Sequence, residues 1–276
     1  MERIKRALEL AQAEREQALR ADAVAAEPAL EAPAPEVPAA EAPERSRRVP
    51  LNEAALREAQ LLLPGMSGRA SHSFKMLRTQ VMRRMKSHGW NSLAVMSAAP
   101  NEGKTFTAIN LAIAIAADKD ATALLVDLDL RAPRVHKRFA FEPTAGVEDC
   151  LRGEATLADT LVSLEGYPNL LLLPARQAVE HSSELISSAS ARAFFSQIKQ
   201  RYANRIVIFD MPPVLGSDDV LAFAPQVDTA LVVIGDNLTK REELNRCFEL
   251  MHDIPVVGTV LNGSRNERSA EYAYGY

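Results

Sequence analysis

Short apolar runs alternate with amphipathic stretches along the chain from Leu51 onwards. The runs are continuously apolar, which is typical of strands covered on both faces. Helical patterns separate them, so the sequence predicts right-handed crossovers and a doubly wound, mostly parallel α/β sheet. The expected strands are Leu93–Ser97, Ala123–Val126, Leu170–Leu173, Ile206–Phe209, Ala230–Ile234 and Val256–Leu261. The expected helices are Leu51–Leu63, Ser71–Lys86, Lys104–Ala117, Ser190–Tyr202 and Lys240–His252.

The two ends of the chain depart from this pattern. Residues 1–20 form a short charged amphipathic segment, which we interpret either as a solvated, frayed helix or as a docking element on a tether. Residues 21–50 are rich in Ala, Pro and Glu, and their prolines remove backbone donors, which predicts a disordered linker. The folded domain is therefore expected over 51–262, followed by a polar, disordered tail over 263–276.

Composition narrows the class of protein. The chain has 276 residues, a net charge of −4 and only 5% aromatic residues, which does not suit a general nucleic-acid binder. Two cysteines are too few for a disulfide scaffold or a Cys-rich zinc module. No apolar run approaches the roughly 18–20 residues of a membrane helix, and the charged start is unlike a secretory signal. We therefore expect a cytoplasmic protein.

A phosphate-binding loop follows the first expected strand of the sheet. Residues 98–105 read AAPNEGKT, which fits the P-loop pattern [AG]xxxxGK[ST] between a strand and a helix. Lys104 would reach the β- and γ-phosphates of ATP, and the Thr105 hydroxyl would bind Mg²⁺. Ala98 and Asn101 stand where many P-loops have Gly, but Asn also tolerates a positive φ. The nucleotide-binding candidates here are Ala98, Ala99, Pro100, Asn101, Glu102, Gly103, Lys104, Thr105 and Phe106.

Carboxylates follow two further expected strands. Asp127 and Asp129 are two residues apart at the end of one strand, so their side chains leave an extended segment on the same side. Asp210 follows four apolar residues, the form of a Walker B carboxylate. Ligands bind at this edge of an open parallel sheet, where such a pair can hold Mg²⁺ and orient or deprotonate an attacking hydroxyl. Either Asp cluster alone is equally compatible with a helix cap or a turn.

These motifs together resemble those of the bacterial tyrosine kinases of exopolysaccharide and capsule synthesis. The resemblance covers residues 71–262 and rests on SFKMLRT, SAAPNEGKTFTAINLA, LLVDLDLRAP and IVIFDMPPVL. Within that family the chain looks most similar to autokinases associated with exosortase-type exopolysaccharide loci, which share its LLPA and SELISS stretches and its Tyr-Gly ending.

The resemblance implies a P-loop NTPase fold and a non-specific, ATP- and Mg²⁺-dependent protein-tyrosine autokinase that regulates polysaccharide chain length or export. Its implied catalytic residues are Lys104, Asp127, Asp129 and Arg131, and its implied metal ligands are Thr105, Asp127 and Asp210. The implied autophosphorylation sites are Tyr272, Tyr274 and Tyr276, modified in trans. Similarity to the wider superfamily adds Asn262 as a contact to adenine, although an Asn-Gly pair also forms turns.

The resemblance also implies partners. Such kinases work as homo-oligomers with a membrane-anchored polysaccharide co-polymerase, the chain-length determinant, which would recruit this chain to the inner face of the cell membrane. The family's ring-forming E-x-x-R-x-x-R motif is incomplete, because His72 and Lys75 replace its Glu and first Arg, and only Arg78 fits.

Two alternatives to the kinase stay open. One is a regulatory ATPase that resembles partition and septum-site proteins and acts by ATP-gated association. Those proteins carry an extra P-loop lysine where this chain has Ala99, so the charge for a nucleotide-sandwich dimer is missing. The other is a nucleotide-binding scaffold with little catalysis.

Overall fold

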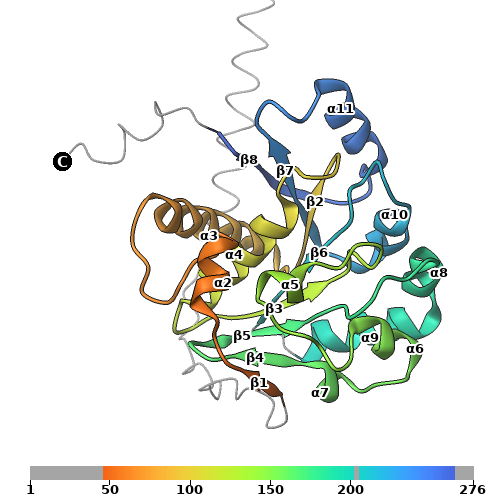
Figure 1. Ribbon diagram of the computed structural model, residues 1–276. Coiled ribbons are helices and arrows are strands. Elements are labelled where there is room, and N and C mark those ends of the chain that lie inside the picture. The colour runs from red at the N-terminus through yellow and green to blue at the C-terminus, as the bar shows by residue number, and fades with distance from the viewer. Residues whose placement is uncertain (1–45, 202–204, 265–276) are drawn as a thin grey trace, which may run out of the picture. The chain divides into compact units, whose positions relative to one another are not determined.

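One eight-stranded sheet runs through the part of the chain that the computed structural model describes, residues 46–201 and 205–264 (Figure 1). Its strands are β1 (Arg47–Val49), β2 (Ser92–Ser97), β3 (Thr122–Asp127), β4 (Val162–Leu164), β5 (Tyr167–Leu173), β6 (Arg205–Asp210), β7 (Thr229–Gly235) and β8 (Val256–Asn262). They lie in the order β1-β4-β5-β3-β6-β2-β7-β8. Every neighbouring pair is parallel except β4 and β5, which confirms the expected doubly wound, mostly parallel sheet.

Helices cover both faces of the sheet. Leu56, Val81 and Ile109 belong to the hydrophobic cluster on one face, which takes in α2 (Glu53–Glu58), α3 (Arg69–His88), α4 (Lys104–Ala116) and α5 (Val135–Arg138). The cluster on the other face takes in α6 (Val147–Arg152), α8 (Ser182–Ser187), α9 (Ala189–Arg201), α10 (Asp219–Phe223) and α11 (Arg241–Leu250). The short α7 (Leu157–Thr160) and the 3₁₀ turn η1 (Ala224–Gln226) complete the described helices.

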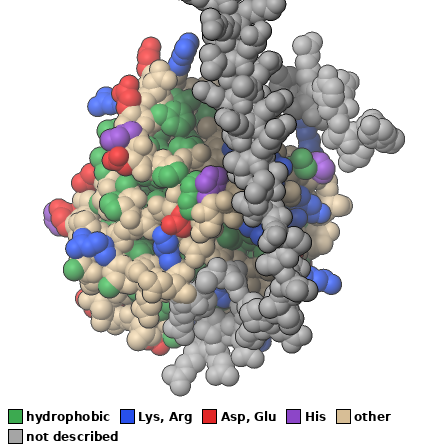
Figure 2. Space-filling model, turned by 180° about the vertical axis from the view of Figure 1, so that it is seen from behind, with side chains coloured by type: hydrophobic (Ala, Val, Ile, Leu, Met, Phe, Trp, Pro, Cys, Tyr) green, Lys and Arg blue, Asp and Glu red, His purple; other side chains and the backbone are tan. Residues whose placement is uncertain are grey.

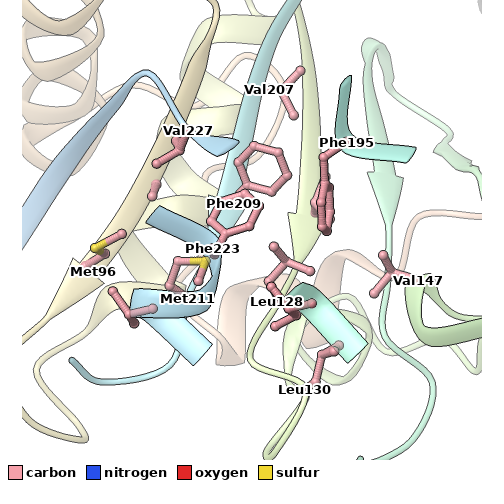
Figure 3. Close-up of a cluster of buried hydrophobic side chains, with 14 of the residues drawn as sticks. Met96, Leu128, Leu130, Val147, Phe195, Val207, Phe209, Met211, Phe223 and Val227 are labelled. Carbon is pink, nitrogen blue, oxygen red and sulfur yellow. The ribbon is translucent and has the colours of Figure 1, made fainter. Parts of the chain in front are cut away.

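Three buried aromatic rings hold the second face of the sheet against its helices (Figure 3). Phe209 of β6 lies 5.8 Å from Phe195 of α9 and 4.7 Å from Phe223 of α10, measured between ring centroids. The rings meet edge to face, the geometry that aromatic pairs prefer. Because Asp210 follows Phe209 directly, this packing also fixes the backbone that carries the Asp210 carboxylate.

The expected elements are confirmed in kind, and most ends lie within three residues of their predicted positions. The first helix is the exception, because α2 ends at Glu58 and Gln60 has a left-handed φ of 58°, while Leu61 and Leu62 pack into the core outside it. The linker prediction is wrong at its end, since β1 lies inside 21–50. Its three residues, RRV, are too few for a hydrophobic period to show.

Some predictions fall outside the described residues. The charged segment 1–20, the linker up to residue 45 and the three tail tyrosines belong to this group. Within the described ranges, no helix has both the length and the hydropathy needed to cross a membrane.

Candidate active site

The three sequence motifs meet at the carboxyl edge of the sheet. Asp127 and Asp210 end neighbouring strands and are paired in register across β3 and β6. The P-loop leaves β2, which lies on the other side of β6. The strand order alone therefore brings together two carboxylates and a phosphate-binding loop that are far apart in the sequence.

The P-loop has the backbone conformation that its sequence predicts. Asn101 has a left-handed φ of 65°, and Gly103, at the N-cap of α4, has a φ of 94°. A side chain at Gly103 would be strained by this φ, and its Cβ would lie 1.9 Å from Nδ2 of Asn262, so the Asn262 side chain would have to move. The first turn of α4 presents free backbone N–H groups and a positive dipole end to this loop, which together favour an anion.

The side chain of Glu102 stabilises the conformation of the P-loop through hydrogen bonds. Its carboxylate is buried, with 1% of the residue exposed, and accepts a hydrogen bond from Ala99 N–H at 2.9 Å. Its other oxygen accepts from the hydroxyl of Thr239, which in turn accepts from Gly235 N–H at 2.8 Å. Asn262 Nδ2 donates to the Glu102 carbonyl at 3.0 Å. The P-loop is thus tied to the loop between β7 and α11 and to the end of β8.

Lys104 and Asp129 form an ion pair beside the P-loop. Their Nζ and Oδ2 atoms are 2.8 Å apart, and the side chains are only 11% and 8% exposed. The sequence indicated each residue separately, and the fold brings them into contact. The Lys104 ammonium group is therefore neutralised by Asp129 in this structure.

Asp127 is buried directly behind this pair. Its Oδ2 accepts from the backbone N–H groups of Arg134 and Val135, at 3.1 and 3.0 Å, and its Oδ1 accepts from Asp129 N–H at 3.3 Å. Burial, followed by the negative charge of Asp210, raises the pKa of Asp127 well above its usual range. Its position favours metal binding and support of Asp129 over direct contact with a protein substrate.

Asp210 carries the least satisfied carboxylate of the site. Both of its oxygens are fully buried and accept no hydrogen bond from the residues that the structure describes. Burial raises its pKa to about 6, and the charge of Lys104 and the neighbouring Thr105 hydroxyl oppose that shift. A buried carboxylate without a partner is unfavourable unless a ligand supplies one.

These residues fit Mg²⁺. The carboxylates of Asp127 and Asp210 and the hydroxyl of Thr105 offer the oxygen ligands that Mg²⁺ prefers. Over 46–201 and 205–264, no three His, Cys, Asp or Glu side chains form a ready-made metal cage. Mg²⁺ sites in phosphoryl-transfer proteins are commonly completed by phosphate oxygens and water, so a partial protein set is what this chemistry needs.

The partners of Arg131 lie outside the cluster formed by Lys104 and the three aspartates. Its guanidinium donates to Asp218 at 2.7 Å, lies 3.6 Å from the buried Asp219, and donates to Ser182 Oγ at 3.3 Å. The Ser182 hydroxyl also contacts both oxygens of Asp219, at 2.9 and 2.8 Å. The structure therefore places Arg131 in a network that joins the loop after β3 to α8 and α10, and its catalytic role stays a prediction.

Comparisons with known proteins give the chain relatives but no matching family model. It is 28% identical to the tyrosine-protein kinase YwqD of Bacillus subtilis over 232 residues, 83% of this chain and 93% of that protein. It is also 28% identical to the tyrosine-protein kinase etk of Escherichia coli over 207 residues, 74% of this chain but only 28% of that protein. The chain thus spans little more than a quarter of the longer relative.

The chain is also similar to solved structures over about three quarters of its length. The kinase domain of Escherichia coli ETK matches with a TM-score of 0.66 and 28% identity, over 75% of this chain and 80% of that one. The chimerical protein CapA2B2 matches with a TM-score of 0.65 and 25% identity, over 78% and 99% of the two chains. In sequence and in fold, the chain is similar to bacterial tyrosine kinases.

A more distant likeness concerns the fold alone. The cell-division ATPase MinD of Pyrococcus furiosus matches with a TM-score of 0.53 and 22% identity, over 64% of this chain and 74% of that one. Bacterial tyrosine kinases and such ATPases share the P-loop sheet. The narrower resemblance of this chain to the exosortase-associated group stays a prediction, as do its individual site residues.

The sequence did not indicate Thr239, Ser182, Asp218 or Asp219. Thr239 reaches Glu102 across 137 positions of the chain, and no local motif marks it. The adenine role of Asn262 stays a prediction, and its amide N–H is engaged by the P-loop in this structure.

Proposed function

We propose that this protein is an ATP-dependent protein-tyrosine autokinase. The observation that carries the proposal is the arrangement at the P-loop, where the buried Lys104–Asp129 pair lies beside the unpartnered Asp210. A phosphate-binding site lined by carboxylates suits the transfer of a phosphoryl group to a hydroxyl.

The proposed mechanism uses three groups of this chain. The P-loop amides and Lys104 bind the phosphates, and the γ-phosphate replaces Asp129 as the partner of the Lys104 ammonium. Asp129 is then free to accept the proton of the tyrosine hydroxyl, as a general base. The tyrosine oxygen bonds to the γ-phosphorus while the bond to the β-phosphate oxygen breaks, and ADP leaves with that electron pair. Mg²⁺, held by Thr105, Asp127 and Asp210, would supply neutralisation of the phosphate charge.

The proposal extends to the physiological role. The acceptors are Tyr272, Tyr274 and Tyr276, phosphorylated in trans within a homo-oligomer. The kinase acts in exopolysaccharide or capsule synthesis, in the cytoplasm, where a membrane-anchored polysaccharide co-polymerase recruits it to the inner face of the membrane and activates it. The motif resemblance supports this role, and the names of the related proteins support the tyrosine-kinase activity on which it rests.

A regulatory ATPase that acts by ATP-gated association is the second candidate. The fold that the chain shares with MinD favours it, whereas Ala99 in place of the extra lysine disfavours it. The two differ in their product, since the kinase yields phosphotyrosine and the switch yields free phosphate.

The test follows both products from MgATP. With the full chain we expect phosphotyrosine to accumulate, and Asp129→Asn to lower its rate about 100-fold or more, the range for loss of a general base. Asp120→Asn, an exposed carboxylate outside the site, is the matched control and should change nothing. Release of phosphate without any phosphotyrosine would favour the ATPase.

A further inference from the structure

A pocket of about 390 Å³ opens beside the P-loop, between the loop that follows β6 and helix α11. Arg131, Asp218 and Arg246 supply its charged lining, and Leu221 and Leu250 supply its exposed apolar lining. The proposed mechanism uses none of these five residues.

Backbone hydrogen bonds fix this pocket next to the site of phosphate binding. Val214 N–H donates to the Ser97 carbonyl at 2.9 Å, and Leu215 N–H donates to the Ala98 carbonyl at 3.1 Å. Both Val214 and Leu215 line the pocket, and Ala98 begins the P-loop. A peptide bound in the pocket is therefore held beside the phosphates.

Two arginines line the pocket, and they differ in their ion pairs. Arg131 is already paired with Asp218 at 2.7 Å and lies 3.6 Å from Asp219. Arg246 is exposed and forms no hydrogen bond or ion pair with any residue in the described ranges. Because the Asp218 carboxylate is paired with Arg131, Arg246 is the charged group of the lining that can pair with a ligand. The two leucines beside it are 45% and 37% exposed and offer an apolar surface.

We propose that this pocket selects an acidic residue immediately before the acceptor tyrosine, through an ion pair between Arg246 and the carboxylate of Glu271. Glu271 is the only acidic side chain in the segment EYAYGY at 271–276 and directly precedes Tyr272. Successive side chains of an extended peptide point to opposite sides. With Glu271 and Ala273 facing Arg246 and the leucines, Tyr272 points the other way and is available to the P-loop and Asp129. The inference rests on the proposed kinase activity.

The experiment separates a donor from an acceptor chain. The donor is the full chain with Tyr272→Phe, Tyr274→Phe and Tyr276→Phe, which keeps its active site but has no tail hydroxyl. The acceptor is the full Lys104→Ala chain labelled with a heavy isotope, and mass spectrometry measures its phosphorylation at subsaturating concentration. The donor carries Arg246, Arg246→Ala or Arg246→Glu, and the acceptor carries Glu271, Glu271→Gln or Glu271→Lys. Arg241→Ala, an exposed arginine on the same helix outside the pocket, is the control.

We expect Arg246→Ala and Glu271→Gln each to lower the rate about two- to fivefold, the range for a partly exposed ion pair, and to have no additive effect together. Donor Arg246→Glu should recover with acceptor Glu271→Lys, a rescue that a merely structural role of Arg246 would not produce. The pocket assignment would be overturned if Glu271→Gln lowered the phosphorylation rate equally with every residue at position 246 of the donor. It would also be overturned if Glu271→Lys did not rescue Arg246→Glu. Absence of acceptor phosphotyrosine with the unaltered Arg246 and Glu271 would instead overturn the proposed function.

Discussion

The residues of the candidate site are held in an electrostatically unfavourable state. Asp127, Asp129 and Asp210 share one buried region with a single paired ammonium, Lys104. Desolvation and mutual repulsion raise the pKa values of Asp127 and Asp210, and neither effect serves stability. A cluster of groups with strongly perturbed pKa values is typical of a functional site. A bound cation and phosphates would offset the unfavourable electrostatic energy of the buried carboxylates.

Lys104→Ala should abolish productive binding of MgATP, because the site loses its phosphate-neutralising charge. The change also leaves Asp129 as an uncompensated buried carboxylate, so we expect a loss of about 3 kcal/mol of stability. Adding Asp129→Asn should recover the stability but not the binding. Titration calorimetry and thermal unfolding measure the two effects separately, and unchanged affinity for MgATP in Lys104→Ala would show that the P-loop assignment is wrong.

Asp210 predicts a pH dependence of stability in metal-free buffer. Its pKa in the folded protein, about 6, lies above the ordinary value of 3.8, so between these values the folded state holds a proton that the unfolded state has lost. The free energy of unfolding therefore falls as pH rises from about 4 to about 6 and changes little above that. Asp210→Asn removes this loss, worth about 1 to 3 kcal/mol.

Chemical denaturation of both proteins at several pH values, with a chelator present, measures this difference. The gap between Asp210→Asn and the unaltered protein should widen between pH 4 and 6. Asp120→Asn, with an exposed side chain, should show no widening. A gap that does not change with pH would contradict the burial argument.

The conformation of the P-loop depends on a contact with a residue that is far away in the sequence. Thr239 precedes α11, and its hydroxyl connects Gly235 N–H to the buried Glu102 carboxylate. Thr239 is thus a positioning residue for the phosphate-binding loop, because a shift of Glu102 would release Ala99 N–H as well.

Thr239→Val should raise the KM for ATP about tenfold while kcat changes much less, since the variant loosens the loop without touching the reacting atoms. A tenfold change corresponds to about 1.4 kcal/mol, which is within the cost of an unsatisfied buried group. Thr239→Ser keeps the hydroxyl and should restore the KM. Thr79→Val, on the exposed side of α3, is the matched control. Equal KM values for the Val and Ser variants would rule out a role for the hydroxyl.

The elements divide into those that a local pattern marks and those that it does not. Five strands, β2, β3, β5, β6 and β7, carry four or more apolar residues in a row, and β8 carries two apolar pairs, so these six could be predicted. The strand order then brings Asp127, Asp210 and the P-loop together. β1 and β4 have three residues each and are held by pairing with their neighbours. The Thr239–Glu102 contact and the Arg131 network depend on side chains that only the fold brings together, so the sequence could not indicate them.

At the scale of the whole molecule, the described surface has no single electrostatic character. Figure 2 shows basic, acidic and hydrophobic side chains interspersed over one face, consistent with a net charge of −4. Helix α3 is the exception, with six Lys and Arg residues and no acidic one. The positive charge on α3 suits an acidic surface of another subunit or of a membrane partner.

The proposed phosphorylation in trans requires that the tail of one copy can reach the active site of another. About ten residues separate Asn262 from Tyr272, a reach of roughly 35 Å when extended, which is enough to enter a neighbouring active site. Entry into the site of the same chain is harder, because the chain must turn back while the hydroxyl approaches the γ-phosphate in line.

The kinase proposal is tested most directly by mixing a donor chain that ends at Asn262 with the full Lys104→Ala chain, in MgATP and with the cytoplasmic part of a polysaccharide co-polymerase present. We expect phosphotyrosine at Tyr272, Tyr274 or Tyr276 of the Lys104→Ala chain, located by mass spectrometry, and none when the donor also carries Asp129→Asn. Phosphate release from the mixture without any phosphotyrosine on the Lys104→Ala chain would contradict it.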